Sequence, residues 1–277
     1  MPDEKEPDSL LDDRVTSDRG QRSYAALYRQ ARPDEIRGEG STNYTKRPTH
    51  TGVAARARQV LGPDLKLIYL VREPVSRLVS HHHHELGDPT VSEDVNEAVR
   101  SYHPLIAYSR YVMQLEPWLQ AFGLDQLSIV QFESYIADRK TTVEQLGAFL
   151  GFDVHPEQID TNQIFNRTTR KPVTKGWLKR FQTSVLYRRY LRRLTSRAVR
   201  EMVKQRLLPR HPPRPEPPTP QTVDWIIEQV QDDAKALGKL LGRSDPLWDF
   251  DAVRRKYSRL GIMDTVEPAS AAVPSGG

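Results

Sequence analysis

The sequence contains no cysteine among its 277 residues. Disulfide bonds and thiolate metal sites are therefore excluded, while the absence leaves the compartment open. No apolar run approaches the length of a membrane-spanning helix, no secretory apolar region stands at the N-terminus, and the mean hydropathy is −0.65. There is also no internal repeat. We expect a soluble protein without a membrane partner, with the cytoplasm as its default location.

The chain is long enough for one large or two small domains, and its net charge of +5 is unevenly distributed. Residues 167–210 hold fifteen lysine or arginine residues and one acid, Glu201. Aromatic residues are interleaved with this charge, a pattern that raises nucleic-acid binding as a possibility. However, Leu186, Tyr190 and Leu194 recur every four residues, which favours a helix with one packed stripe and a solvated basic face. We therefore expect no nucleic-acid partner.

Residues 66–80 carry the most information about function. Leu67 to Val71 form an uninterrupted apolar run, as expected of a strand buried on both faces of a parallel sheet. Arg72 ends this run, and Pro74 suits the first position of a helix. In open α/β sheets, ligands bind beyond the carboxyl ends of the strands, where a helix N-terminus favours an anion. Arg72 would supply a planar cationic fork, and Ser80 a hydroxyl donor.

These residues resemble the 3′-phosphate-binding motif of sulfotransferases that use 3′-phosphoadenosine 5′-phosphosulfate (PAPS). The shared features are the arginine that ends the strand, the proline two residues later and the serine eight residues after the arginine. Residues 38–44 resemble the Gly-Glu-x-Ser-x-x-Tyr segment of the carbohydrate and heparan sulfate branch. Residues 24–28 resemble the family's aromatic-bearing helix, and residues 115–122 resemble its acceptor-side helix. Residues 127–133 resemble its late strand that ends in glutamate, and residues 146–152 resemble its helix end with the sequence Phe-Leu-Gly.

The resemblance implies an α/β protein with a three-layer α/β/α architecture and a central parallel sheet, the P-loop-containing nucleotide hydrolase-like fold of sulfotransferases. It covers most of the chain. We expect a single domain over residues 1–262, followed by a disordered tail at 263–277 whose residues are small and polar. PAPS is the implied donor co-substrate, and no metal is implied.

One part of the family pattern has no counterpart between Met1 and Gly38. This part is the first strand with its Pro-Lys-x-Gly-Thr-Thr-like loop, the P-loop that holds the 5′-phosphosulfate. Lys5-Glu6-Pro7 resembles the Lys-Glu-Pro segment that follows the loop, so we expect the chain to begin about thirty residues late relative to the family pattern. A mis-assigned start codon or a genuine truncation would account for this. Without the loop we expect the chain as written to transfer sulfate poorly or not at all.

The resemblance also assigns candidate site residues. Glu6 corresponds to the catalytic carboxylate that accepts the acceptor's proton, and Lys5 could stabilise charge beside it. On the acceptor side, Ser41 and Tyr44 are implied substrate-binding residues, with Glu39 holding their loop. A late basic loop of the family covers the nucleotide, and the residues that could fill this role are Arg170, Lys171, Lys175 and Gly176.

Four consecutive histidines, residues 81–84, suggest a metal site, but their spacing argues against it. Helical ligands to one ion sit three or four residues apart, so four adjacent side chains diverge around the axis. Only His81 with His84 or with Glu85 could converge, and no second cluster supplies more ligands. We expect no metal site, and we assign His81 and His84 to the acceptor cleft.

Two functions follow from these observations. The first is a sulfotransferase that moves a sulfuryl group from PAPS to a hydroxyl of a carbohydrate or small-molecule acceptor. The alternative is a truncated, non-catalytic homologue that binds adenosine 3′,5′-bisphosphate or an anionic partner. The sequence does not define the acceptor or the oligomeric state. Hydrophobic periodicity further predicts a strand at 127–132 and helices at 51–60, 105–122, 141–150 and from Pro220 onward.

Overall fold

The computed structural model describes residues 2, 5–86, 88–158 and 216–265. The chain divides into two compact units, which are described separately. Unit 1 comprises residues 1–78, 103–168 and 230–247, and unit 2 comprises residues 79–102, 169–229 and 248–277. The single domain expected over residues 1–262 stays a prediction.

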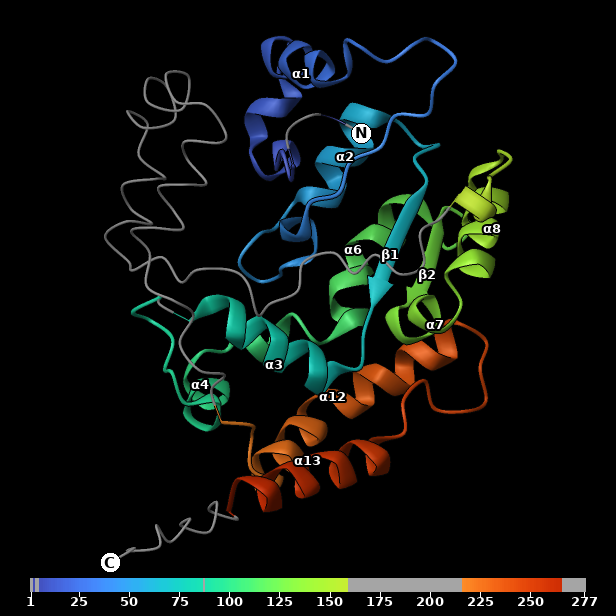
Figure 1. The fold of residues 1–277 in the computed structure, drawn as a ribbon. Helices are drawn as coiled ribbons and strands as arrows, with labels where there is room; N and C mark the ends of the chain where they lie inside the picture. Colours follow the sequence, from blue (N-terminus) through green and yellow to red (C-terminus); the bar gives the residue numbers. More distant parts are fainter. Residues whose placement is uncertain (1, 3–4, 87, 159–215, 266–277) are drawn as a thin grey trace, which may run out of the picture. The chain divides into compact units, whose positions relative to one another are not determined.

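The described elements are mostly helices, with two short strands between them (Figure 1). The strands are β1, Leu67–Val71, and β2, Leu127–Gln131. The α-helices are α1 (Asp18–Ala25), α2 (Val53–Leu61), α3 (Pro74–Glu85), α4 (Val95–Ser101), α5 (Pro104–Ala107), α6 (Tyr111–Phe122), α7 (Phe132–Ala137), α8 (Arg139–Leu150), α12 (Pro220–Leu240) and α13 (Phe250–Thr265). Short 3₁₀ helices occupy Ser9–Leu11, Asp13–Thr16, Ala26–Tyr28, Thr42–Thr45 and Pro156–Gln158.

The two strands pair in parallel, with Leu67 opposite Leu127 and Val71 opposite Gln131 (Figure 1). Parallel strands require a crossover connection, and here α3 to α6 lie between β1 and β2 in the sequence. The α/β class and the parallel pairing predicted from the sequence are thus confirmed. Within the described residues the sheet has two strands.

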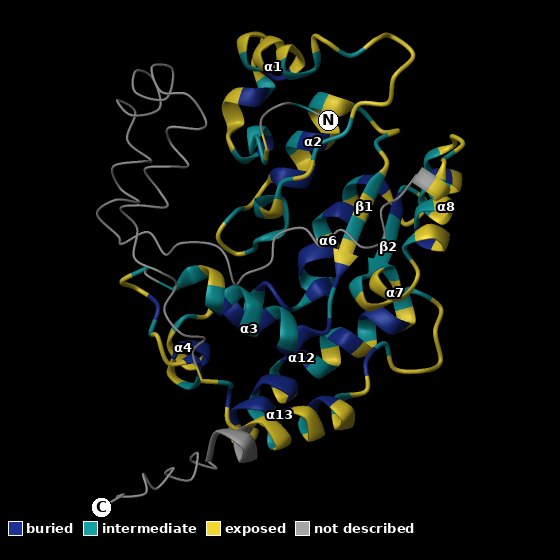
Figure 2. Cartoon of the chain, in the orientation of Figure 1, coloured by how far each residue is buried: buried dark blue, intermediate teal, exposed yellow. Residues whose placement is uncertain are grey.

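The prediction that β1 is buried on both faces is wrong. Ile68 and Leu70 are 47% and 53% exposed, whereas Val71 is fully buried. Figure 2 shows both exposed and less exposed residues along β1. Successive side chains of a strand point to opposite faces, so alternate residues share one environment. In the described part of the chain, only β2 pairs with β1, and the face that carries Ile68 and Leu70 is exposed. The apolar run in the sequence therefore does not show whether neighbouring elements cover one face of the strand or both.

The helix predicted over 105–122 is interrupted. The structure has α5 and α6 with a break at Tyr108–Arg110, where Arg110 adopts extended backbone angles. A carboxylate distant in sequence caps the second helix: both oxygens of Asp233 accept backbone N–H bonds, from Val112 and Met113, at 3.0 Å. This cap stabilises a new helix start that the local sequence does not signal.

The predicted helix over 141–150 is confirmed as α8. The Asp138 carboxylate accepts a hydrogen bond from the backbone N–H of Thr141 and caps the first turn. Gly151 ends the helix with φ of 80°, the left-handed conformation that glycine adopts without a steric penalty. β2 also matches its predicted strand, except that Phe132 already belongs to α7.

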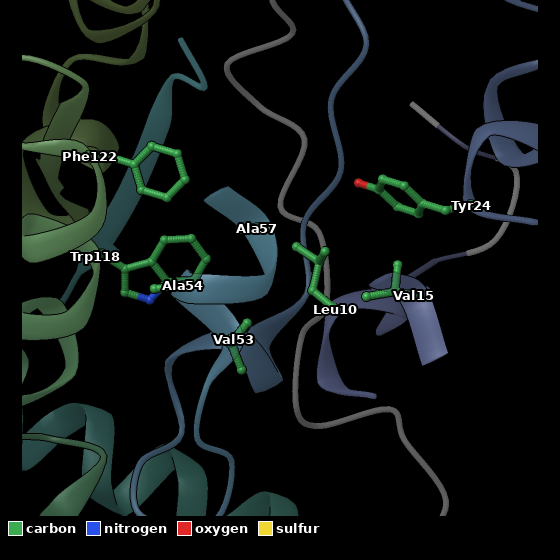
Figure 3. Close-up of a cluster of buried hydrophobic side chains, with 8 residues drawn as sticks. All are labelled: Leu10, Val15, Tyr24, Val53, Ala54, Ala57, Trp118 and Phe122. Atoms are coloured by element: carbon green, nitrogen blue, oxygen red, sulfur yellow. The ribbon is translucent and has the colours of Figure 1, made fainter. Parts of the chain in front are cut away.

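The core of unit 1 joins the N-terminal segment to α2 and α6 (Figure 3). Trp118 and Phe122 stack at 6.1 Å between ring centroids, one turn apart on α6. They pack with the remaining members of one buried cluster, which are Leu10, Val15, Tyr24, Val53, Ala54 and Ala57. Residues more than a hundred positions apart in the sequence thus build one wall of unit 1.

Unit 2 contains α4, the first turns of α12, and α13. Thr219 accepts a hydrogen bond from the backbone N–H of Thr222, and Pro220 is the first helical residue, as the sequence predicts. The apolar face of α12 is buried along its length and consists of Val223, Ile226, Ile227, Val230, Ala234 and Leu237. None of the helices in the described ranges is long and apolar enough to cross a membrane.

The sequence analysis did not anticipate α13. The Asp249 carboxylate accepts a hydrogen bond from the backbone N–H of Ala252, and Val253 and Tyr257 are buried one turn apart. An aspartate followed by apolar residues four apart was the available signal. Because α13 continues to Thr265, it includes the first residues of the expected tail. Residues 266–277 lie outside the described part of the chain.

Candidate functional site: a cationic pocket along β1

A pocket of about 1110 Å³ lies along β1 in unit 1. We call it the β1 pocket. Its walls come from the loop before α2, from β1 itself, from the first turns of α3, and from α6. Residues 65–70 line it continuously, and this stretch includes the exposed Ile68 and Leu70. The exposed apolar side chains of β1 are therefore part of a cavity wall.

The lining of the β1 pocket is aromatic and positively charged. Its aromatic residues are Tyr24, Tyr28, Tyr44, Tyr69, Tyr108, Tyr111 and Trp118. Among the described residues, its charged lining consists of six cations, Arg29, Arg37, Lys46, Lys66, Arg72 and Arg77, and a single carboxylate, Glu39. Such a lining favours an anionic ligand that also has an apolar or ring-shaped body.

Arg72 lies where the sequence predicts it, directly after β1, and it lines the pocket. Its backbone is fixed by Tyr111 of α6, whose hydroxyl accepts the Arg72 N–H at 3.1 Å and donates to the Arg72 carbonyl. Burial raises the pKa of Tyr111 to about 12, so this hydroxyl keeps its proton at neutral pH. The Arg72 guanidinium packs over the Phe132 ring, 5.2 Å from its centroid. Backbone and side chain are thus both positioned before any ligand binds.

The N-terminus of α3 does not offer the anion site that the sequence predicts. The carboxylate of buried Glu73 accepts the backbone N–H groups of Val75 and Ser76, at 2.6 and 2.8 Å. The Glu73 N–H in turn donates to Glu133 at 2.8 Å. A side chain of the protein thus occupies the donors that would otherwise face an anion. A phosphate near Arg72 would rely on side chains.

Ser41 and Tyr44 also line the pocket, and they fix the N-terminal segment. The Ser41 hydroxyl accepts the backbone N–H of Asp8, and the Tyr44 hydroxyl accepts that of Leu10, both at 3.2 Å. Tyr44 donates in turn to Glu39 at 2.5 Å. Tyr28 donates to the other Glu39 oxygen at 3.2 Å. Glu39 therefore holds this loop together, the role that the sequence analysis assigned to it.

Lys5 and Glu6 stand just before this anchored stretch but do not themselves line the β1 pocket. Lys5 is exposed, and Glu6 is half-buried. Glu6 and Asp8 both have positive φ, 53° and 54°, which L-residues seldom adopt. Asp8 accepts a hydrogen bond from the Asn43 amide at 2.8 Å. The local contacts therefore impose a tight bend on the segment that carries Glu6.

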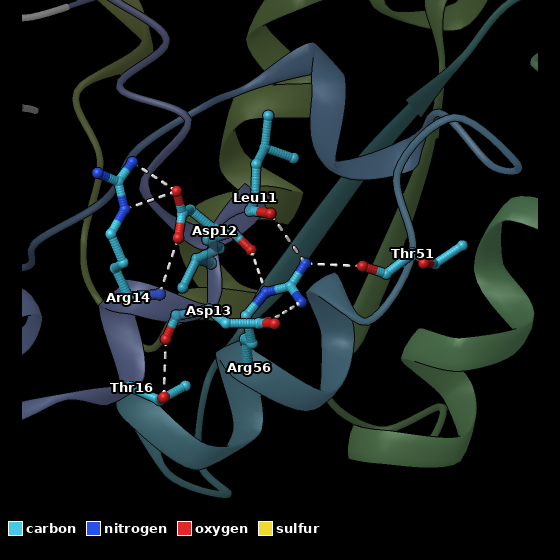
Figure 4. Close-up of polar contacts among 8 residues, drawn as sticks. Leu11, Asp12, Asp13, Arg14, Thr16, Thr51 and Arg56 are labelled. Carbon is cyan, nitrogen blue, oxygen red and sulfur yellow. Dashed lines mark hydrogen bonds and ion pairs between the residues drawn. The ribbon is translucent and has the colours of Figure 1, made fainter.

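Arg56 of α2 clamps the following residues of the same segment (Figure 4). Its guanidinium donates to the carbonyl oxygens of Leu10, Leu11 and Thr51, at 2.6, 3.2 and 2.7 Å. It also pairs with the Asp13 carboxylate at 2.6 Å. This largely buried side chain thus donates hydrogen bonds to three carbonyl groups and forms an ion pair with one carboxylate.

The histidines of α3 belong to unit 2 and do not line the β1 pocket. His81 and His84 both approach Glu85, at 3.4 and 3.5 Å. His82 is buried, and its Nε2 bonds the Ser92 carbonyl at 2.8 Å, so Nε2 carries the proton. His82 therefore fixes the loop before α4. Within the described ranges no group of three or more histidine, aspartate or glutamate side chains could hold a metal ion.

Ser80 is half-buried on α3 in unit 2, so its pairing with Arg72 stays a prediction. Arg170, Lys171, Lys175 and Gly176 lie outside the described residues. The sequence analysis missed Arg77, Lys46, Tyr108 and Tyr111 as pocket residues. Arg77 and Lys46 had local signals, since Arg77 lies five residues after Arg72 on the predicted helix and Lys46 lies two residues after Tyr44. Tyr108 and Tyr111 reach the pocket through contacts distant in sequence.

A parallel sheet with a fixed arginine at the carboxyl end of a strand, beside a pocket lined by cations, defines the class as an α/β protein with a cationic pocket at its sheet. Residues 26–201, more than half of the chain, match the sulfotransferase domain family. The chain belongs to this family, as the resemblance of its motifs predicted.

The chain is similar to two curated relatives from Mus musculus. It is 28% identical over 169 residues to heparan sulfate glucosamine 3-O-sulfotransferase 3B1, a match that covers 57% of this chain and 42% of that protein. It is 29% identical over 171 residues to heparan sulfate glucosamine 3-O-sulfotransferase 3A1, with the same two coverages. The chain thus spans less than half the length of these relatives.

The fold is similar to that of a sulfotransferase from Alicyclobacillus acidocaldarius in its crystal structure. The TM-score is 0.51 at 20% sequence identity, over 92% of this chain and 87% of the other. This likeness agrees with the sulfotransferase α/β fold that the sequence predicts.

Proposed function

We propose that the protein is a PAPS-dependent sulfotransferase with a P-loop-like nucleotide-binding fold, and that it acts on a hydroxyl of a carbohydrate or small-molecule acceptor. The observation that carries the proposal is the coincidence of the family match with the geometry of Arg72, a fixed cation between β1 and α3 that faces a pocket. The names of the curated relatives favour a carbohydrate among the acceptors.

Sulfuryl transfer requires little covalent chemistry from the protein. The acceptor oxygen bonds to sulfur while the sulfur–oxygen bond to the donor's 5′-phosphate breaks, and the acceptor's proton passes to a base. By analogy with phosphoryl transfer, positioning and charge stabilisation supply most of the catalysis. We assign the base to Glu6, because its segment matches the family's Lys-Glu-Pro pattern. The anchoring of this segment by Ser41 and Tyr44 supports the assignment.

The donor's 3′-phosphate would be held by Arg72 with Ser80. Contact with Phe132 restricts the guanidinium plane, so less rotational freedom is lost when its N–H groups bind phosphate oxygens. Arg170, Lys171, Lys175 and Gly176 are the proposed additional contacts from the late basic loop.

The alternative is a non-catalytic homologue that binds adenosine 3′,5′-bisphosphate or an anionic partner. One observation favours it: Glu6 is not among the residues that line the β1 pocket. Binding without transfer would distinguish this alternative from the enzyme. The assay is transfer of labelled sulfate from PAPS to a panel of sugar and small-molecule alcohols.

Calorimetry with adenosine 3′,5′-bisphosphate tests the proposed donor site. Arg72→Ala should weaken binding by roughly 10- to 100-fold, since a hydrogen bond to a charged group contributes about 1.5–3 kcal/mol. Arg22→Ala is the matched control, because Arg22 is an exposed arginine of α1 outside the pocket lining. Equal affinities for the wild type and Arg72→Ala would refute the assignment of this site.

A further inference from the structure

The peptide group between Arg72 and Glu73 is held at both of its polar atoms. Its carbonyl oxygen, that of Arg72, accepts a hydrogen bond from the Tyr111 hydroxyl of α6. Its N–H, that of Glu73, donates to the Glu133 carboxylate of α7 at 2.8 Å. A trans peptide is planar and directs these two groups to opposite sides, so a rotation of its plane breaks hydrogen bonds to two different helices. With the Arg72 N–H bound to Tyr111 at 3.1 Å, the backbone is fixed on both sides of the Arg72 Cα.

The register of the sheet explains how α7 reaches this peptide. Val71 of β1 lies opposite Gln131 of β2, and the two strands run in parallel, so the residues that follow leave the sheet side by side (Figure 1). The Phe132 ring packs against the Arg72 guanidinium, 5.2 Å from its centroid. Glu133 then binds the next peptide group. Two consecutive residues of α7 thus contact the side chain of Arg72 and the peptide that follows it.

The Glu133 side chain is exposed, whereas Glu73 is buried. The Glu73 carboxylate already accepts the N–H groups of Val75 and Ser76 at the start of α3. An exposed side chain contributes little to the core, and its hydrogen bond replaces one that water could make, so its net effect on stability is small. The contact is therefore better explained by the direction that it gives to the chain at Arg72.

We propose that Glu133 is a positioning residue of the donor site, which aims the Arg72 guanidinium by holding the peptide group that follows it. The proposal rests on the proposed function, because it requires that Arg72 binds the donor's 3′-phosphate. Glu133 acts through Arg72, so the position of its acceptor oxygen matters and its charge does not. A side chain that is ordered before binding loses less freedom when the ligand arrives, and the benefit is therefore seen in the affinity for the 3′-phosphate.

Calorimetry on the full chain with two ligands isolates the 3′-phosphate. Adenosine 5′-monophosphate differs from adenosine 3′,5′-bisphosphate only by that group, so the ratio of its dissociation constant to that of the bisphosphate measures the contribution of the 3′-phosphate. Glu133→Ala should lower this ratio roughly three- to tenfold, the range expected when one side chain must be ordered on binding. Glu133→Gln keeps an oxygen at the same reach and should retain the wild-type ratio. Glu133→Asp keeps the charge but is one methylene shorter, and it should lower the ratio.

A double-mutant cycle shows whether Glu133 acts through Arg72. In an Arg72→Ala background, Glu133→Ala should leave the ratio unchanged, because the side chain that it positions is absent. Glu144→Ala is the control, since it removes an exposed glutamate of α8 outside the pocket lining and should keep the wild-type ratio. Thermal denaturation of each variant accompanies the titrations. A role confined to stabilising the turn would lower the melting temperature and leave the ratio unchanged.

An unchanged ratio in Glu133→Ala would overturn the proposal. If that variant does not fold, the other two decide: a retained ratio in Glu133→Asp with a lowered one in Glu133→Gln would mean that charge matters and position does not. An equal loss in the Arg72→Ala background would also overturn it, because Glu133 would then act by another route. A wild type that binds both ligands equally refutes the donor site and the proposal together. The expected ratios without transfer of labelled sulfate from PAPS would support the role of Glu133 and refute the enzyme.

Discussion

Glu39 organises the loop that links the N-terminal segment to the β1 pocket. Its two oxygens accept hydrogen bonds from two tyrosines, and one of these tyrosines also accepts the backbone N–H of Leu10. Burial, together with the hydrogen bond to Glu39, raises the pKa of Tyr44, and burial raises that of Tyr28 to about 12. Both hydroxyls therefore remain donors throughout the physiological range.

Tyr44→Phe should lower the free energy of unfolding by about 1.5–3 kcal/mol, because it removes a hydrogen bond to a charged group and leaves the Leu10 N–H without its acceptor. Urea denaturation of the full chain measures the change. Tyr135→Phe is the control, since the Tyr135 side chain stacks with Arg139 and its hydroxyl bonds no described residue. Equal stabilities of the two variants would contradict the role of the Glu39 network.

The position of a single residue can be predicted from the sequence where the spacing of its neighbours in the chain determines it. Arg72 occupies its predicted place, because the strand, the proline and the helix are all encoded within a few positions. The carboxylate of Glu73 binds the N–H groups at the start of α3, and spacing alone does not show that this side chain turns back toward its own helix. The sequence shows that Arg77 is charged, but it does not show that Tyr69 of β1 and Tyr111 of α6 lie close to the guanidinium.

Among the elements, α6 shows how a distant carboxylate defines a helix start. Asp233 binds two N–H groups of its first turn. Burial raises the pKa of Asp233, and this effect outweighs the opposing effect of these hydrogen bonds. The folded state therefore binds the proton of Asp233 more tightly than the unfolded state does.

This difference predicts a pH dependence of stability. A raised carboxyl pKa in the folded state contributes stability below the unfolded pKa, near 3.8, that is lost as the pH rises through the folded pKa. Asp233→Asn does not titrate, so the stability of the wild type relative to this variant should fall as the pH rises from about 3 to about 6. Urea denaturation of both proteins across this range measures it. A relative stability that rises with pH would contradict the assigned shift.

Helix signals were more predictable than strand burial. Asp138 and Gly151 bracket α8 as their residue types suggest, and Thr219 and Pro220 begin α12. The burial of β1 differed from the prediction because an apolar run shows only that the side chains are apolar. It does not show whether a neighbouring element covers each face of the strand. The break before α6 could not be read locally, because its cap comes from Asp233.

Across the whole molecule, ligand binding should affect the elements unequally. A ligand that binds only the folded state suppresses the openings that disrupt its site and leaves unrelated local openings unchanged. We expect saturating adenosine 3′,5′-bisphosphate to slow amide hydrogen exchange in β1 and the first turns of α3. Exchange through local openings at the end of α13 should not change.

Hydrogen exchange read out by mass spectrometry, with adenosine as the control ligand that lacks both phosphates, makes this comparison. Protection confined to α13, or absent from β1, would contradict the proposed donor site. The family and the fold class were predictable at this scale because motif order extends over most of the chain. The β1 pocket was not, since its walls combine residues 10–77 with residues 108–127.

The Arg56 clamp has a consequence for the order of folding. Arg56 bonds Leu10 across 46 residues, so this contact can form only after a long loop has closed, and closure of longer loops is entropically less favourable. From residue 5 to the start of α1, the N-terminal segment has only short 3₁₀ helices, and it therefore depends on these contacts. We expect it to dock late during folding and to detach early during unfolding. Partial denaturation would then release the proposed base, Glu6, while β1 and β2 are still paired.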